Sequence, residues 1–121
     1  MIDRLELSLL LDYYGSFLTD TQLDVLRLTC DEDLSLSEIA EQRGISRQGV
    51  RDAITRGERT LLEMEQRLRL IQRDGRIKAV VRTIESELHS LMGAERNDPK
   101  YDKLFSLISE LSDITEGNDG I

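Results

Sequence analysis

Apolar residues recur every three or four positions along almost the whole chain, which is the period of an amphipathic helix. No segment alternates apolar and polar residues as a half-buried strand would. The pattern therefore predicts an all-α protein. The first predicted helix carries one apolar stripe: Ile2, Leu5, Leu9 and Tyr13, flanked by Leu10, Tyr14 and Phe17. The helical spacing of its aromatic residues favours a core or a dimer seam over an RNA-stacking surface.

Two capping boxes mark the starts of further helices. In a capping box, a Ser or Thr accepts a hydrogen bond from the backbone amide three residues on, and a Glu or Gln at that residue bonds back. Thr19 with Gln22 and Ser35 with Glu38 have this spacing. We expect Gly44 to end the second of these helices, because Gly adopts a positive φ without steric cost.

A long helix with an apolar seam is predicted to begin after Ser46, and Asp74-Gly75 predicts a break or kink beyond it. We expect the C-terminal helices to cover part of the seam and a second copy of the chain to cover the rest. The seam comprises Val50, Ala53, Ile54, Gly57, Leu61, Met64 and Leu68.

Two more amphipathic segments follow, the second opening at Asp98-Pro99, where Pro suits the first helical position. This organisation predicts a helix-turn-helix domain over residues 1–70, a helical extension over 71–115 that packs on it or on a dimer partner, and a frayed tail over 116–121.

Residues 35–59 have the spacing of a helix-turn-helix motif. The steep crossing of its two helices needs a small residue in the first helix and Gly or similar in the turn, here Ala40 and Gly44. On the second helix, Arg can bind guanine edges, Gln can bind adenine, and the helix start can contact a phosphate. The candidate nucleic-acid-binding residues are Ser46, Arg47, Gln48, Arg51, Thr55 and Arg56.

The distribution of charge also points to the middle of the chain as a binding region, but it does not by itself assign a function there. The chain has a net charge of −8, but residues 1–42 carry −8, residues 43–82 carry +6 and residues 83–121 carry −6. An acidic chain with a basic middle can bind a polyanion through that middle. On charge alone, a solvated helix of mixed charge is the better explanation, so the helix-turn-helix spacing is needed to favour binding.

Several classes of protein are disfavoured by composition. The 121 residues contain one Cys and one His, with no run of about 18 apolar residues, so we expect no internal disulfide and no membrane span. The N-terminus lacks the pattern of a signal peptide, which predicts a cytoplasmic protein. Cys30 has no nearby base and His89 stands alone, so we expect no enzymatic activity, metal or cofactor.

The run Tyr13–Gln22, together with residues 33–40 and 44–50, resembles the YlxM family. These are small bacterial proteins with a helix-turn-helix similar to region four of sigma factors. The resemblance is specific over residues 9–68 and is a helical pattern only beyond them. The sequence departs from the family at Gly49, Arg51 and Gly57, where Ala, an aromatic residue and Thr are common.

The resemblance implies a role as well as a fold. The family's gene usually lies beside that of the signal recognition particle (SRP) GTPase, which implies a regulator or accessory of SRP-dependent protein targeting, often dimeric. Its expected partners are the SRP protein, the SRP RNA or both, and a second copy of the chain. The alternatives are a sequence-specific transcription regulator that binds duplex DNA and a module that binds protein alone.

Overall fold

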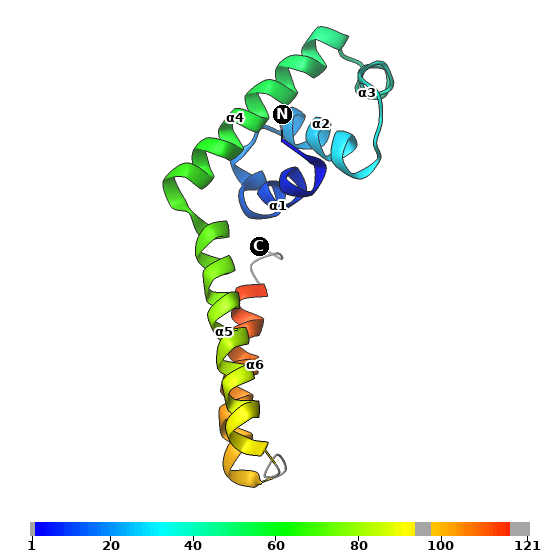
Figure 1. Ribbon diagram of the computed structural model, residues 1–121. Coiled ribbons are helices and arrows are strands. Elements are labelled where there is room, and N and C mark those ends of the chain that lie inside the picture. Colours follow the sequence, from blue (N-terminus) through cyan, green and yellow to red (C-terminus); the bar gives the residue numbers. More distant parts are fainter. Residues whose placement is uncertain (1, 94–97, 117–121) are drawn as a thin grey trace. The chain divides into compact units, whose positions relative to one another are not determined.

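The computed structural model of the chain describes residues 2–93 and 98–116, and all regular elements in those residues are helices, which confirms the predicted all-α class (Figure 1). No helix in these two ranges is long and apolar enough to span a bilayer. The chain divides into an N-terminal unit, Met1–Ile71, and a C-terminal unit, Gln72–Ile121. The elements are α1 (Arg4–Tyr14), η1 (Gly15–Phe17), α2 (Asp20–Asp31), α3 (Leu36–Arg43), α4 (Arg47–Leu68), α5 (Leu70–Met92), η3 (Pro99–Tyr101) and α6 (Asp102–Glu116).

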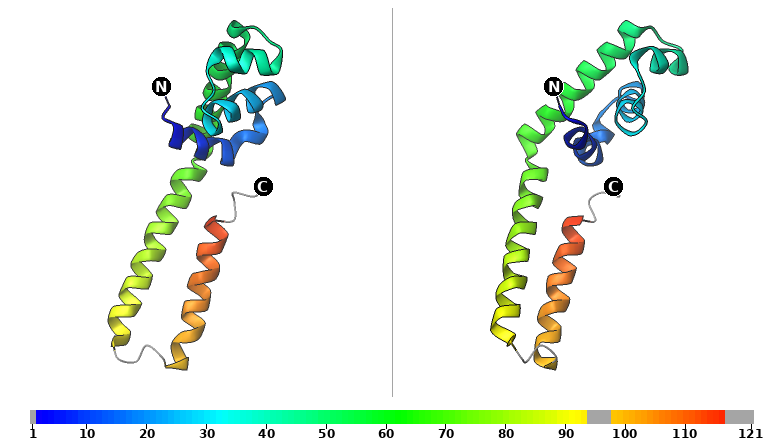
Figure 2. Two further views of the ribbon diagram at one scale, coloured as in Figure 1. Left: turned by 90° about the vertical axis from the view of Figure 1, so that its right-hand side faces the viewer. Right: turned by 45° about the vertical axis from the view of Figure 1, so that its right-hand side comes forward.

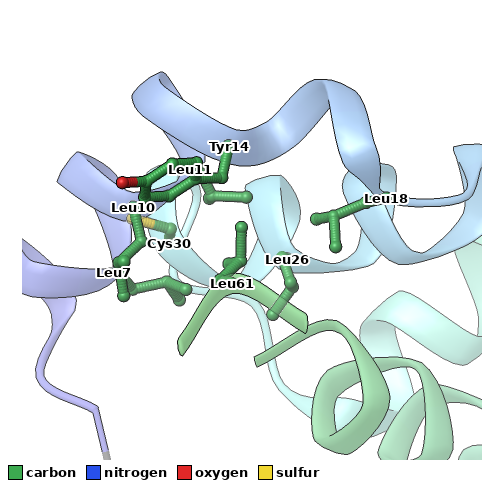
Figure 3. Packing of buried hydrophobic residues seen from close by; sticks show 8 residues of the cluster. All are labelled: Leu7, Leu10, Leu11, Tyr14, Leu18, Leu26, Cys30 and Leu61. Atoms are coloured by element: carbon green, nitrogen blue, oxygen red, sulfur yellow. The ribbon is translucent and has the colours of Figure 1, made fainter. Parts of the chain in front are cut away.

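In the N-terminal unit, α1, α2 and α3 pack along α4 (Figure 1). One cluster of buried side chains joins α1, α2 and the middle of α4, and Figure 3 shows it from close by: Leu7, Leu10, Leu11, Tyr14, Leu18, Leu26, Cys30 and Leu61. A second cluster lies under the predicted motif and joins α2, α3 and the start of α4. Burying each large aliphatic side chain stabilises the fold by roughly 1.5–3 kcal/mol.

Helix α1 buries only part of its apolar surface within its own unit. The buried residues are Leu7, Leu10, Leu11 and Tyr14, whereas Leu5 is 84% exposed, Leu9 is 41% exposed and Phe17, in η1, is 58% exposed. These last three residues therefore lie outside the core of the unit, and the alternative of a dimer seam stays a prediction for them. Leucines surround the whole helix, so spacing alone does not select the face that the other helices cover.

The predicted capping boxes are confirmed. The amide of Gln22 donates to Thr19 Oγ1 at 3.2 Å and the amide of Thr19 donates to Gln22 Oε1 at 3.1 Å. Ser35 and Glu38 make the equivalent pair of bonds, both at 3.1 Å. Accepting the Ser35 amide lowers the pKa of the exposed Glu38 carboxyl. Gly44 ends α3 in the left-handed conformation with φ 68°, as predicted.

The apolar seam of α4 is covered within its own unit. Val50 packs with side chains of α2 and α3, and Leu61 packs with side chains of α1 and α2. From Val50 to Leu61 the seam is thus covered without C-terminal helices or a second copy, and for Leu68 that expected cover stays a prediction. The helices that come before α4 in the chain supply the cover, and Leu68 at its far end is exposed.

The helical path breaks at Arg69 and not at the predicted Asp74-Gly75, which lies inside α5. Arg69 adopts a positive φ of 55°, and its amide donates to the Glu65 carbonyl at 2.8 Å. The next amides also find acceptors, because Leu70 donates to Tyr14 Oη and Ile71 donates to Glu65 Oε1, both at 3.1 Å. These bonds satisfy the first amides of α5 and fix the break here.

In the C-terminal unit, α5 and α6 run antiparallel as a helical hairpin (Figure 2). The His89 and Phe105 rings lie 5.2 Å apart between their centroids and join the two helices. Asp98 begins the second arm, because its carboxylate accepts the Lys100 amide at 3.0 Å. Glu116 belongs to α6 and not to the predicted tail, whose other residues, 117–121, lie outside the described ranges.

Candidate nucleic-acid interface

The helices α3 and α4 form the helix-turn-helix that the spacing predicts. The left-handed Gly44 reverses the chain, and the amides of Gly44 and Ile45 both donate to the Ala40 carbonyl. Ile39 and Val50 are fully buried where the two helices cross, and the small Ala40 side chain lies in the same cluster. This packing fixes the start of α4 relative to α3 and leaves the opposite side of α4 open.

All six candidate residues lie at the exposed start of α4. Ser46 caps the helix, since its Oγ accepts the Gly49 amide at 2.9 Å. Arg47, Arg51 and Thr55 are spaced by four residues and therefore lie along one side of the helix, and all three are exposed. The other two members of the set, Gln48 and Arg56, are also exposed and lie in a second row beside the first.

An acidic side chain lies within this face. Gln48 Nε2 donates to Asp52 Oδ1 at 3.3 Å across one turn of α4. The Gln48 amide is therefore already engaged, and a base or phosphate would have to compete with the Asp52 carboxylate for it. The sequence indicates that Asp52 lies close to the face, but the pairing with Gln48 depends on side-chain conformations that spacing does not give.

Arg43 belongs to the basic segment of the sequence but is engaged within the unit. Its guanidinium lies 2.9 Å from Asp24 Oδ2 and 3.5 Å from Thr21 Oγ1, both on α2. This ion pair ties the end of α3 to α2. Arg43 therefore contributes less free positive charge to the interface than its place in the sequence indicates.

Two of the positions at which the sequence departs from the YlxM family are glycines of α4, and the structure gives a reason for each. A Cβ at Gly57 would lie 2.6 Å from Leu26 Cδ1, so the missing side chain permits the close approach of α2 and α4. A Cβ at Gly49 would lie 3.2 Å from Ser46 Oγ, the atom that caps the helix. Gly57 is thus a packing residue, and Gly49 leaves space beside the cap.

Other chemistry-bearing residues of the N-terminal unit have structural roles. Cys30 is buried, and its thiol donates to the Arg4 carbonyl at 3.5 Å. The Arg4 guanidinium in turn donates to the carbonyls of Cys30 and Asp31 at the end of α2. Within residues 2–93 and 98–116, no group of three or more His, Cys, Asp or Glu side chains is arranged to hold a metal ion.

Comparison with known proteins identifies the family. The family model described as "Putative helix-turn-helix protein, YlxM / p13 like" matches residues 1–113. The chain belongs to this UPF0122 family. It is 41% identical to a UPF0122 protein of Clostridium acetobutylicum over 75% of the chain and 78% of that relative. It is 36% identical to a UPF0122 protein of Clostridium perfringens over 90% of the chain and 99% of that relative.

Proposed function

We propose that this UPF0122 protein is a non-enzymatic regulator of SRP-dependent protein targeting that binds the SRP protein, the SRP RNA or both through the start of α4. The observation that carries the proposal is the exposed row of Arg47, Arg51 and Thr55 on a well-packed helix-turn-helix. The YlxM resemblance supplies the pathway, through the gene neighbourhood that it implies. Arginine on a rigid helix suits both phosphate and carboxylate partners, because its planar guanidinium binds either in two-pronged fashion.

Reversing two charges on this row tests the site. The double variant Arg47→Glu, Arg51→Glu should bind purified SRP protein or SRP RNA at least about tenfold more weakly than the unmodified chain. A matched control, Arg67→Glu, Arg82→Glu, changes the net charge equally at exposed positions away from the row and should bind normally. Unchanged binding by the first variant, or an equal loss in both variants, would contradict the assignment.

The same assay separates the alternative function, a sequence-specific regulator that binds duplex DNA. The chain is titrated with SRP protein, SRP RNA and duplex DNA at two salt concentrations. A DNA-binding regulator should discriminate between duplexes and lose affinity steeply as salt increases. Selective duplex binding without SRP binding would favour the alternative over our proposal.

We also propose that the chain acts as a homodimer, through the hairpin of the C-terminal unit. The hairpin leaves seven large apolar side chains at least 40% exposed. Those of α6 recur at spacings of three and four and so form one stripe. These residues are Val80, Ile84 and Leu91 on α5, and Leu104, Leu107, Leu111 and Ile114 on α6.

The area of these exposed apolar side chains favours a second copy of the hairpin as the partner that covers them. The exposed parts of these side chains amount to roughly 700 Å² per copy, so two copies would bury on the order of 1,400 Å², which is typical of a specific interface. Two hairpins packed face to face would form a four-helix bundle, the arrangement that lets short amphipathic hairpins bury their apolar faces.

Placing charge on the α6 stripe should therefore separate the copies. The variant Leu107→Asp, Ile114→Asp should sediment as a monomer at concentrations where the unmodified chain is a dimer. Because both positions are more than half exposed, the helix content of each copy should change little by circular dichroism. Ser106→Asp, Ser109→Asp places the same charges at exposed polar positions of α6 and should stay dimeric. A monomeric unmodified chain would contradict the proposal.

A further inference from the structure

Helix α1 is apolar on two opposite faces, and its own unit covers only one of them. Leu7, Leu10 and Leu11 point into the core (Figure 3). On the far side, Leu5 and Leu9 are exposed at a spacing of one turn. A helix at the surface of a globular protein ordinarily carries one apolar stripe and a polar opposite face, so a second stripe indicates a second contact.

The second stripe continues beyond α1. Tyr13, one turn after Leu9, is half-buried, and Phe17 of η1, four residues further along, is 58% exposed. We call Leu5, Leu9, Tyr13 and Phe17 the outer stripe. At 1.5 Å per helical residue, the part on α1 from Leu5 to Tyr13 is roughly 12 Å long, which matches about two turns of a partner helix.

Carboxylates border the outer stripe. By the helical repeat, Glu6 and Asp12 lie on either side of it, and both are exposed. Arg4 is the only basic residue before Arg27, and its guanidinium is bonded to the carbonyls of Cys30 and Asp31 at the end of α2. The border of the stripe that α1 itself supplies is therefore acidic.

The helix that carries the stripe is anchored at both ends. Its N-terminus is fixed by the Arg4 bonds and by Asp3, whose carboxylate accepts the Glu6 amide at 2.8 Å. Its C-terminus is fixed by Tyr14, whose hydroxyl donates to Glu65 at 2.6 Å. A partner that binds the outer stripe thus meets a preformed surface and incurs little ordering cost on this side of the contact.

We infer that the outer stripe binds a basic amphipathic helix of a partner protein, with leucine-type residues on the stripe and Lys or Arg against Glu6 and Asp12. Charge selects this occupant, because an acidic border repels an acidic helix and attracts a basic one of the same apolar pattern. The stripe lies on α1 and not on the α4 row, so the chain would offer two separate binding surfaces. The inference does not depend on the identity of the partner proposed above.

Two designed peptides test the inference with the full-length chain. Both are 14-residue helices with leucines at the same helical spacing, one with Lys and the other with Glu at the polar positions, each carrying a fluorophore. Fluorescence anisotropy should show the Lys peptide binding at least about tenfold more tightly than the Glu peptide. The variant Leu5→Ser, Leu9→Ser should weaken the Lys peptide by about tenfold or more, with no change in net charge.

A matched variant controls for general attraction to an acidic chain. Leu62→Ser, at an exposed leucine of α4, should bind the Lys peptide as the unmodified chain does. Equal affinity for both peptides would overturn the inference, and so would a loss of Lys-peptide affinity in the Leu62 variant equal to that in the Leu5, Leu9 variant. A change of oligomeric state in the Leu5, Leu9 variant would also overturn it, because the stripe would then be a contact between copies of the chain. If that double variant melts at a lower temperature, Leu5→Gln alone tests the most exposed position. SRP binding is measured separately with the Arg47→Glu, Arg51→Glu variant, so this inference and the proposed function can each fail without the other.

Discussion

Replacing Gly57 with Ala should lower the free energy of unfolding by about 1–3 kcal/mol, even though Ala is the better helix former. The added Cβ would lie 2.6 Å from Leu26 Cδ1, inside van der Waals contact, and Leu26 is completely buried. Leu26 would therefore have to change its rotamer within a packed cluster, or α2 and α4 would have to separate. Either change costs more than the roughly 1 kcal/mol that helix propensity returns.

Gly75→Ala is the matched control, because it makes the same substitution in the interior of α5 where a Cβ meets nothing within 4 Å. That variant should be stabilised by up to about 1 kcal/mol. Urea denaturation of both variants and the unmodified chain, followed by circular dichroism at 222 nm, measures the difference. A Gly57 variant as stable as the Gly75 variant would contradict the close approach of α2 and α4.

The local start and stop signals of this chain could be read from its sequence, because each depends on residues within one turn. The boxes at Thr19 and Ser35, the positive φ of Gly44 and the Ser46 cap all form as predicted. In each case the acceptor and the amide lie within five residues of each other, so no distant part of the chain is needed to complete the bond.

Features that depend on distant residues could not be predicted in this way. Leucines surround α1, and only the approach of α2 and α4 decides that Leu7 is buried and Leu5 is not. The break between α4 and α5 likewise depends on Tyr14, which comes more than 50 residues before the amide that it accepts. A Gly beside an Asp is the stronger local break signal, yet Gly75 lies inside α5.

The candidate interface likewise has some features that follow from the sequence and others that depend on the folded structure. That Arg47 and Arg51 share an exposed side of α4 follows from their spacing once α4 is known to be a helix. That Gln48 is paired with Asp52 and Arg43 with Asp24 does not follow, because these bonds depend on rotamers and on the placement of α2. Residue spacing thus predicts where a site lies, whereas the pairing of its charged and polar side chains is known only from the folded structure.

Removing the hydroxyl of Tyr14 should be as costly as filling the space at Gly57. Tyr14→Phe deletes the bond to Glu65 and leaves the Leu70 amide without its acceptor at the break between α4 and α5. Loss of these bonds at a fully buried side chain should lower the free energy of unfolding by about 1–3 kcal/mol. Urea denaturation gives the value, with the half-buried Tyr101→Phe as the control that should change it little.

The same hydroxyl should give the chain a distinctive alkaline transition. Burial, followed by the bond to Glu65, raises the pKa of Tyr14 from 10.0 to about 12. Below pH 10 the phenol is protonated in both the folded and unfolded states, and its contribution to stability is complete. Between pH 10 and 12 the unfolded chain ionises first, so roughly 2–3 kcal/mol of stability should be lost as pH increases. The quantity to measure is the stability difference between the unmodified chain and Tyr14→Phe at each pH, because this difference isolates the Tyr14 hydroxyl. That difference should shrink from pH 9 to pH 12, and a constant difference would contradict a buried, protonated Tyr14 at the break between α4 and α5.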